Sequence, residues 1–385
     1  MNIDTITTAP SEITIIGGSL AGLTLALACA RRSVPVRIVE RTTGHVHGGD
    51  SLSIDLDVVA ATVGYDPRVQ PVLPVVPAYR ELTTWPALYA WLRDRVAATP
   101  GIVVEDGRAV ASLTDLGDCA RVTFADGSER IAAAVIGADG YRSIVRRAIA
   151  PEDPFARYAG YLVWRGLIEE RELTHPVPWP SDGGLWIEFV DGYRLVAAAL
   201  PGRDGSLEVG RRQITFAWFD AHRDELLRRT GCLTDDGHIV GTLGRGMIEN
   251  KVREELALLA PRLWPAAWAE AVVAGVRSPG VLSGAPIAEY KPSRLARGAL
   301  AVVGDAAHVV SPMTGRGYLT GVEDAAVLAQ ILGYRETSEP IATAFARYEA
   351  ARLPYVRGLV THSSRISAEY RRYAQSDSSG FLADT

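Results

Sequence analysis

The chain has 385 residues, 48% of them hydrophobic, and a formal net charge of −5. A chain of this size and composition buries a large core, and we expect one large domain or two domains that share a boundary. Because the net charge is negative and no basic tract is present, neither nucleic acid nor an anionic membrane surface is expected as the main partner, which leaves small molecules.

The N-terminal segment and the cysteines bear on the compartment. Residues 1–11 are polar and lack both the basic start and the apolar run of a signal peptide. Apolar stretches elsewhere are shorter than the roughly 18 to 20 residues of a membrane span. Cys29, Cys119 and Cys232 are far apart and form no C-x-x-C pair, so we expect neither a metal site nor a disulfide framework. We therefore expect a cytoplasmic protein without a membrane span.

The segment from residue 13 to residue 40 has the order of a dinucleotide-binding unit. A β-branched run, 13–16, ends at Gly17, residues 21–32 carry apolar residues at helical spacing, and a second β-rich run ends at Glu40. In the G-x-G-x-x-G motif the first glycine makes the tight turn and the third lets helix and strand pack closely. Gly17 and Gly22 fill these positions, and an acid about 20 residues after the turn accepts hydrogen bonds from an adenosine ribose.

Ser19 stands at the second glycine position of this turn. Its hydroxyl can cap the following helix or meet a phosphate oxygen, and the helix N-terminus still favours an anion. An ordinary α/β turn without a ligand is the alternative. We predict that this segment binds a dinucleotide through Gly17, Gly18, Ser19, Leu20, Ala21, Gly22, Glu40 and Arg41.

Two further glycine–acid motifs follow later in the chain. Residues 135–140, V-I-G-A-D-G, come after a predicted hairpin and before a helix that starts near Ser143. Residues 300–303 form another buried-strand run, which leads through a proline and two glycines into a helix predicted over 320–332. An acid beside glycine at a strand's carboxyl end suits a ligand with hydroxyls and an electron-rich group, although each motif alone is also a plain turn. The residues predicted to bind the cofactor here are Asp139, Gly140, Gly304, Asp305, Pro312, Gly315, Arg316 and Gly317.

Taken together, the three motifs resemble the class A, single-component flavoprotein monooxygenases related to para-hydroxybenzoate hydroxylase. The resemblance spans nearly the whole chain and implies that the first motif holds the FAD pyrophosphate, the second serves FAD and the transient nicotinamide, and the third contacts the ribityl chain. Residues 158–166 and 200–203 look like segments of the 2,6-dihydroxypyridine hydroxylase branch. Relatives often have glutamine where this chain has Arg316, whose side chain either brings positive charge near the flavin or points to solvent.

The resemblance also implies the domain organisation. We expect an α/β chain with a Rossmann-like FAD-binding domain of the GR2-type flavoprotein fold, interrupted by an antiparallel β-sheet substrate domain and followed by a C-terminal helix. The expected boundaries are 1–156 for the first part of the FAD-binding domain, 157–282 for the substrate domain, and 283–385 for the second part with the helix. Runs at 160–168, 184–190, 193–200 and 213–219 predict the strands of the inserted sheet.

A pocket is expected where the flavin edge meets this sheet, because ligands favour domain boundaries. Since side chains alternate along a strand, half of the strand aromatics are expected to face the pocket and the others to pack in the core or face solvent. The aromatic candidates are Trp164, Trp186, Tyr193, Phe216 and Trp218. The C-terminal helix is predicted over 341–373, with a break near Pro354.

The resemblance implies a reaction as well. NADPH or NADH reduces FAD and leaves, and O2 then forms a flavin C4a-hydroperoxide that hydroxylates a small aromatic compound, phenolic or N-heteroaromatic. A base near the substrate hydroxyl would assist, and the candidates are His45, His47 and Tyr193, with a solvated loop histidine as the alternative for the first two.

Other functions known for flavin-binding proteins are alternatives to hydroxylation. A flavin-dependent halogenase is disfavoured, because both lysines, Lys251 and Lys291, lie late in the chain and no W-x-W-x-I-P motif is present. Baeyer–Villiger insertion or epoxidation on the same scaffold remains open, as does a non-redox flavin-binding protein. The sequence leaves the oligomeric state open, a homodimer included.

Overall fold

The β-branched run after residue 12 forms the centre of a six-stranded sheet in the computed structural model, which describes residues 12–43, 51–77, 81–179 and 184–377. The sheet has the order β15-β16-β9-β1-β2-β5, and all its pairs are parallel except β15 with β16. Its strands are β1 (Ile13–Ile16), β2 (Val36–Val39), β5 (Ile102–Glu105), β9 (Ala134–Gly137), β15 (Ala296–Arg297) and β16 (Leu300–Val302). Near-continuous apolar runs are typical of parallel strands that are covered on both faces.

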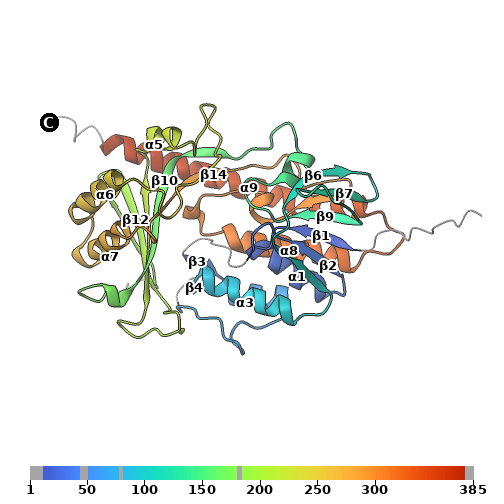
Figure 1. Ribbon diagram of the computed structural model, residues 1–385, viewed down its shortest axis with the longest axis horizontal. Helices are drawn as coiled ribbons and strands as arrows, with labels where there is room; N and C mark the ends of the chain where they lie inside the picture. The colour runs from blue at the N-terminus through green and yellow to red at the C-terminus, as the bar shows by residue number, and fades with distance from the viewer. Residues whose placement is uncertain (1–11, 44–50, 78–80, 180–183, 378–385) are drawn as a thin grey trace, which may run out of the picture.

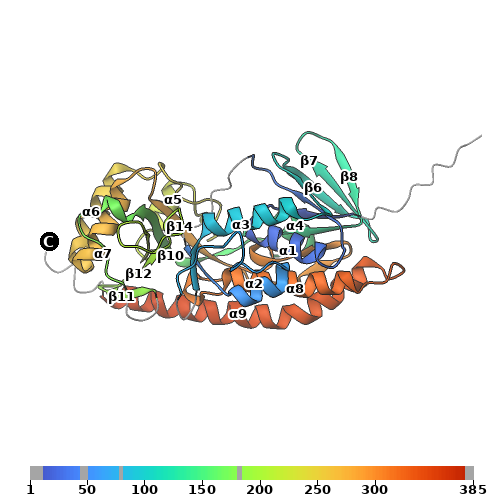
Figure 2. The same cartoon turned by 90° about the horizontal axis from the view of Figure 1, so that it is seen from below.

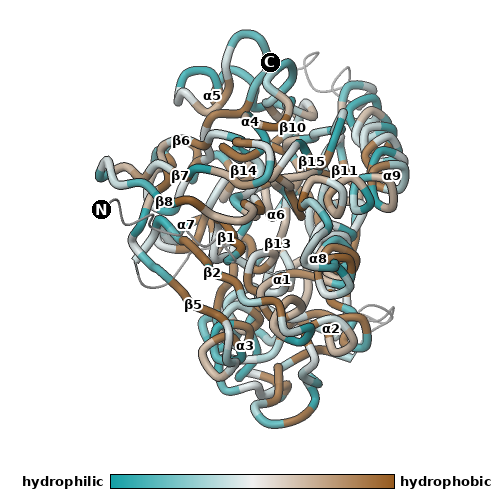
Figure 3. Tube along the Cα trace, turned by 90° about the vertical axis from the view of Figure 1, so that its right-hand side faces the viewer, coloured by the Kyte–Doolittle hydropathy of each residue, from teal (hydrophilic) through white to brown (hydrophobic). Residues whose placement is uncertain are grey.

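Helices cover one face of this sheet and a small antiparallel sheet lies on the other side, as Figures 1 and 2 show. The helices are α1 (Leu20–Ala30), α2 (Leu56–Val63), α3 (Trp85–Ala98) and α8 (Gly317–Gly333). The opposite side holds β6 (Val110–Asp115), β7 (Ala120–Phe124), β8 (Glu129–Ala132) and the short helix α4 (Ile144–Ile149). The hydrophobic segments of the tube coincide with strands such as β2 and β5 (Figure 3).

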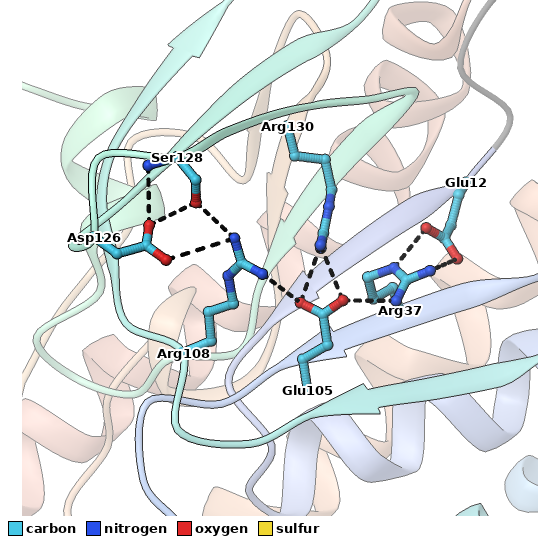
Figure 4. A network of polar contacts seen from close by, with 7 residues as sticks. All are labelled: Glu12, Arg37, Glu105, Arg108, Asp126, Ser128 and Arg130. Carbon is cyan, nitrogen blue, oxygen red and sulfur yellow. Dashed lines mark hydrogen bonds and ion pairs between the residues drawn. The ribbon is translucent and has the colours of Figure 1, made fainter.

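A network of charged side chains ties the edge of the large sheet to the small one (Figure 4). Arg37 on β2 binds Glu12 and Glu105 at 2.7 Å each, and Glu105 at the end of β5 also accepts from Arg130 on β8 at 2.9 Å. Arg108 completes the network through Ser128 at 2.6 Å. The two sheets are thereby fixed to each other at the end far from the inserted domain.

The second unit is a five-stranded antiparallel sheet with the order β11-β12-β13-β10-β14. Its strands are β10 (Arg157–Glu169), β11 (Trp186–Val190), β12 (Tyr193–Leu200), β13 (Gln213–Asp220) and β14 (Ser283–Glu289). Four of them confirm the strands predicted from the sequence. The fifth, β14, lies beyond the expected boundary at residue 282, so the last strand of the sheet comes from the segment assigned to the FAD-binding domain.

The outer face of this sheet is covered by α6 (Asn250–Leu263) and α7 (Ala266–Arg277), with α5 (Asp224–Arg229) nearby. In Figure 1 the sheet stands between these helices and the two-stranded antiparallel sheet of β3 (Ser51–Ile54) and β4 (Glu81–Thr84). The fold class expected from the sequence, an α/β domain with an inserted antiparallel sheet and a C-terminal helix, is confirmed.

The C-terminal helix α9 (Ile341–Asp377) runs along both units (Figure 2). The predicted break near Pro354 is wrong, since the helix continues through this residue. Proline removes one backbone hydrogen bond, but packing on both sides holds the helix. Tyr348, before the proline, is buried and donates to the Val302 carbonyl at 2.9 Å, and Val356, after it, is also buried. None of the helices in the described residues is long and apolar enough to cross a lipid bilayer.

Candidate functional site

The three glycine–acid motifs meet at one edge of the parallel sheet. Ile16 at the end of β1 lies in register with Gly137 at the end of β9, and Gly137 lies in register with Val302 at the end of β16. The first and third motifs come into contact, because a Cβ added to Gly304 would lie 2.9 Å from the Ala21 Cβ. Ligands of open α/β sheets bind at this carboxyl edge.

The glycines of the first turn are fixed by backbone contacts. Gly17 has φ +106°, and a Cβ there would lie 2.4 Å from the Ala138 carbonyl oxygen. A Cβ at Gly22 would lie 1.9 Å from the Gly17 carbonyl oxygen. The turn, the second motif and the helix therefore pack backbone against backbone, which leaves the first turn of α1 close to any ligand at the edge.

Ser19 precedes α1 as its N-cap residue, but its hydroxyl makes no capping hydrogen bond. The first turn of α1 also carries no acidic side chain, so the helix N-terminus keeps free N–H groups and its positive dipole end. Of the two roles predicted for the Ser19 hydroxyl, capping is wrong, and contact with a phosphate oxygen stays a prediction.

Glu40 links the first turn to the end of β2. Its carboxylate is buried and accepts from the Gly18 N–H at 2.8 Å and from the Thr42 N–H at 2.9 Å. A carboxylate offers about four lone-pair positions, so two remain for hydroxyl donors. Arg41, the next residue, is exposed.

The two aspartates of the later motifs have unused carboxylate oxygens. Asp139 accepts from the Ile144 N–H at 2.7 Å through Oδ2, but Oδ1 is buried without a hydrogen-bond partner, and burial raises its pKa. Asp305 is solvent-exposed, although protein surrounds it closely enough for burial to raise its pKa. Gly140, beside Asp139, has φ +76°.

Arg146 joins the second and third motifs, and the sequence analysis did not assign it a role. Its guanidinium is buried and donates to the carbonyls of Tyr141, Pro154, Asp305 and Ala306, the last two at 3.2 Å. The only signal for this role in the sequence is the position of Arg146 on the helix after the second motif. Without this residue the two loops would lose the donor that they share.

The loop after the third motif is held by the inserted sheet and by α9. Ser311 accepts from the Met313 N–H at 3.0 Å, shares a hydrogen bond with the Tyr161 hydroxyl at 2.7 Å, and donates its N–H to Ser363 at 2.8 Å. Pro312 begins one 3-10 turn, and Gly315 ends it with φ +60°. Gly317 is the first residue of α8.

Arg316 has two partners within the protein, and its predicted role at the cofactor stays a prediction. Its Nη2 donates to Glu323 on α8 and to the Tyr355 hydroxyl on α9, each at 2.6 Å. The positive charge is thereby compensated within the helical layer, and the side chain connects α8 to α9.

A buried ionic cluster lies behind the third motif. His308 Nε2 is 2.6 Å from Asp324, which also accepts from the Gly304 N–H at 3.1 Å and from Arg352 on α9 at 2.8 Å. Burial acts to raise the pKa of Asp324, but the neighbouring His308 and Arg352 lower it overall. His308 is buried in this cluster and thereby helps to hold the loop of the third motif in place.

The two faces of the inserted sheet have different surroundings. One face packs against α6 and α7, and the five aromatic pocket candidates all belong to this side: Trp164, Trp186, Tyr193, Phe216 and Trp218. The expectation that about half of them face the pocket is wrong. The side chains of all five leave the sheet on the same face and pack in the core that α6 and α7 cover. A hollow lined by Trp264, Ala269 and Val273 also lies on this outer side, away from the three motifs.

Of the three candidate bases, the structure describes only Tyr193. Tyr193 packs edge-on against Trp218 and His222, and burial raises the pKa of Tyr193 to about 12. Both features disfavour a role for Tyr193 as a base at the flavin. His45 and His47 lie outside the described residues, so their role stays a prediction.

The other face of the sheet looks toward the FAD-binding domain. At one end Leu167 and Ala198 pack with Leu82 of β4, and at the other end Val163 packs in a cluster with Met313 of the late loop. Thr215 Oγ1 lies 3.5 Å from Ser51 Oγ across the boundary. Five strand positions on this face are only half-buried, and two of them, Val196 and Ala217, pack against the cluster of Val163 and Met313. The five positions are Arg165, Val196, Ala217, Ser283 and Ala285. This row is the candidate substrate cleft.

The residues at the sheet edge fit FAD. Free N–H groups at α1 suit a pyrophosphate, the remaining lone pairs of Glu40 suit ribose hydroxyls, and the unused oxygens of Asp139 and Asp305 suit hydroxyl or N–H donors. Comparison with known sequences agrees. A family model described as FAD binding domain-like matches residues 158–283, and one described as FAD binding domain matches residues 269–363. Over residues 158–363 the chain is thus similar to FAD-binding flavoproteins.

Proteins with sequences similar to this chain include FAD-dependent hydroxylases and monooxygenases. A urate hydroxylase from Klebsiella oxytoca is 30% identical over 263 residues, which is 67% of this chain and 57% of that protein. A 3-amino-4-hydroxybenzoate 2-monooxygenase from Streptomyces cremeus is 27% identical over 93% of this chain and 87% of its own length. The aligned part of the chain thus spans little more than half of the urate hydroxylase.

The fold has close counterparts among solved structures. The 2,6-dihydroxypyridine-3-hydroxylase from Arthrobacter nicotinovorans superimposes with a TM-score of 0.75 over 95% of this chain and 94% of that one, at 19% identity. This likeness confirms the fold expected from the sequence, with FAD as the family's cofactor.

Proposed function

We propose that this chain is an FAD-dependent monooxygenase that uses NADPH or NADH and O2 to hydroxylate a small phenolic or N-heteroaromatic compound. The observation that carries the proposal is the meeting of three glycine–acid motifs at a sheet edge that faces a half-buried cleft on the inserted sheet. The printed activities of the relatives, on urate and on an aminohydroxybenzoate, support the substrate class.

In this proposal each motif holds one part of FAD. The N-terminus of α1 with Ser19 binds the pyrophosphate, Glu40 accepts from the adenosine ribose, and Asp305 accepts from the ribityl chain. Asp139 is free to accept from FAD or from the visiting nicotinamide. Bound FAD would supply the hydride acceptor and the site of oxygen activation.

The protein contributes a dry, shaped cleft and a proton acceptor. The clusters around Leu82 and Met313 close the cleft at both ends, and exclusion of water protects reactive oxygen species from side reactions. We propose His45 or His47 as the acceptor of the substrate hydroxyl proton, which would make the ring more nucleophilic. In support, the residues on both sides of their segment, Glu40 and Ser51, lie at the cofactor turn and at the cleft.

The test is anaerobic reduction of the FAD-loaded protein by NADPH and by NADH, with and without phenols, hydroxypyridines and urate. We expect one ligand class to accelerate flavin bleaching and, after oxygen is admitted, to gain one oxygen atom in its product. The position of that oxygen separates ring hydroxylation from Baeyer–Villiger insertion and epoxidation. If neither nicotinamide bleaches the flavin under any condition, the monooxygenase proposal is wrong and a non-redox flavin protein remains.

A further inference from the structure

We propose that Arg165 recognises an oxyanion on the aromatic substrate, either a carboxylate or an ionised ring hydroxyl. This inference rests on the proposed function, because it names a chemical feature of the substrate that the cleft would take. It is carried by where Arg165 lies on the sheet and by the lack of any partner for its guanidinium Nε among the described residues.

The register of the sheet places Arg165 in the cleft. It lies directly opposite Ala217 on β13 and Ser283 on β14, and Ala217 lies opposite Val196 on β12. Its alternate neighbours Val163 and Leu167 belong to the clusters that close the two ends of the cleft, so the Arg165 side chain leaves the sheet on the same face.

The guanidinium of Arg165 is not satisfied by the protein. The Arg165 residue is half-buried, and its Nε is buried without a hydrogen-bond partner among the described residues. Buried charges in proteins are usually paired, because an unpaired buried charge is costly. A ligand group that accepts two parallel N–H bonds would supply the missing partner.

Two other arginines of the inserted unit, Arg212 and Arg223, are paired with carboxylates. Arg212 is buried and forks onto Glu170, with its Nε at 2.8 Å from the carboxylate. Arg223 binds Asp220 at 2.6 Å. The Asp220 side chain lies on the helix-covered face of the sheet, where it also accepts a hydrogen bond from Trp164. It is therefore on the side of the sheet away from the cleft.

The neighbours of Arg165 suit a flat ring with an anionic substituent. Ala217 and Val196 give an apolar floor beside it, and the Ser283 hydroxyl at the same level of the sheet can donate one further hydrogen bond. Arg165 also acts on Tyr141, which directly follows the second motif: burial raises the pKa of Tyr141, while Arg142, Arg165 and Arg41 oppose that rise. The positive charge thus lies between the substrate sheet and the cofactor edge.

The test measures ligand binding to the FAD-loaded protein through the change in flavin absorbance, at about pH 8, where arginine stays protonated. Two matched pairs of probes are titrated: benzoate with benzamide for the carboxylate, and 4-nitrophenol with 4-nitroanisole for the ring oxyanion. The variants are Arg165→Gln, which removes the charge, and Arg165→Lys, which keeps the charge but not the planar fork. Arg157→Gln is the matched control, since Arg157 is on the same strand but exposed and outside the cleft.

We expect the anion of at least one pair to bind at least about tenfold more tightly than its neutral partner to the unmodified protein. Arg165→Gln should reduce this preference to below about threefold, Arg165→Lys should give an intermediate value, and Arg157→Gln should leave it unchanged. Which pair responds tells a carboxylate from a ring oxyanion. Unchanged affinity of the neutral partner for Arg165→Gln shows that the cleft is intact.

Two results would overturn the inference. The first is that the unmodified protein binds neither anion more tightly than its neutral partner, or binds none of the probes saturably. The second is that Arg165→Gln keeps the preference for the anion. If Arg165→Gln does not retain FAD, the anion preference of Arg165→Lys is compared with that of Arg157→Gln. Equal preferences in these two variants would then overturn the inference. Binding is measured without a nicotinamide, so failure of flavin reduction would remove the proposed function and leave this result standing.

Discussion

Replacement of Gly22 by alanine tests whether the first glycine turn is a preformed site for the FAD pyrophosphate. The added Cβ would lie 1.9 Å from the Gly17 carbonyl oxygen, about 1.1 Å inside the 3.0 Å below which Cβ contacts are essentially never found. The obstructing atom belongs to the backbone of a turn that itself packs on Ala138, so no side-chain rotation relieves the clash. The helix must move away from the turn.

Overpacking of this kind costs about 3 kcal/mol when the neighbour cannot yield. Because each 1.4 kcal/mol is a factor of ten, loss of the preformed turn should weaken FAD binding by about 100-fold. The assays are urea unfolding of the FAD-free protein and a titration of FAD followed by flavin fluorescence.

The matched control is Gly358→Ala on α9. A Cβ there meets nothing within 4 Å, so the variant should bind FAD normally and gain up to about 1 kcal/mol in stability from the better helix former. If Gly22→Ala binds FAD with unchanged affinity, the close approach of α1 to the turn is not what creates the site, and the reasoning fails.

Three further variants test the neighbouring assignments. Asp324→Asn should lower the free energy of unfolding by about 3–5 kcal/mol, because it leaves His308 and Arg352 without their buried partner. Ion pairing lowers the pKa of Asp324, so its contribution to stability is present above the ordinary aspartate pKa of about 4 and is lost as pH falls through the folded-state pKa. The free energy of unfolding of the variant should therefore fall less steeply with decreasing pH than that of the unmodified protein, and parallel curves would contradict this. Arg316→Gln should cost about 1 kcal/mol or less and leave the flavin absorbance spectrum unchanged, whereas a shifted spectrum would return Arg316 to the flavin. Tyr193→Phe should keep the rate of substrate hydroxylation within about threefold, and a loss of about 100-fold with an altered pH profile would reinstate Tyr193 as the base.

Local signals in the sequence were sufficient for the cofactor edge. Strand, tight turn, helix and acid follow one another along the first 40 residues, and each step depends on neighbours in the chain. The β-branched run, the glycines and Glu40 therefore predicted a dinucleotide turn even with Ser19 in place of a glycine. The family models confirm FAD as the ligand class.

The same local reasoning could not orient the inserted sheet. Periodicity shows that Trp164 and Trp218 share a face of their strands, but only the packing of α6 and α7 shows that this face is the core. The side that faces the cofactor carries small residues around Arg165, whose significance depends on β13 and β14 lying beside it.

Residues that join distant segments were also beyond the sequence. Arg146 serves carbonyls about 160 positions away, and Arg316 finds its partners on two helices that the chain brings together only after folding. The sequence by itself determined a dinucleotide turn and the strands of the inserted sheet, because these follow from short-range patterns of turn chemistry and hydrophobic alternation. FAD and the two-part fold were implied by the resemblance of the three motifs to a known family. Only the tertiary structure decided which face forms the cleft and which charges are left unpaired, because both depend on contacts between segments far apart in the chain.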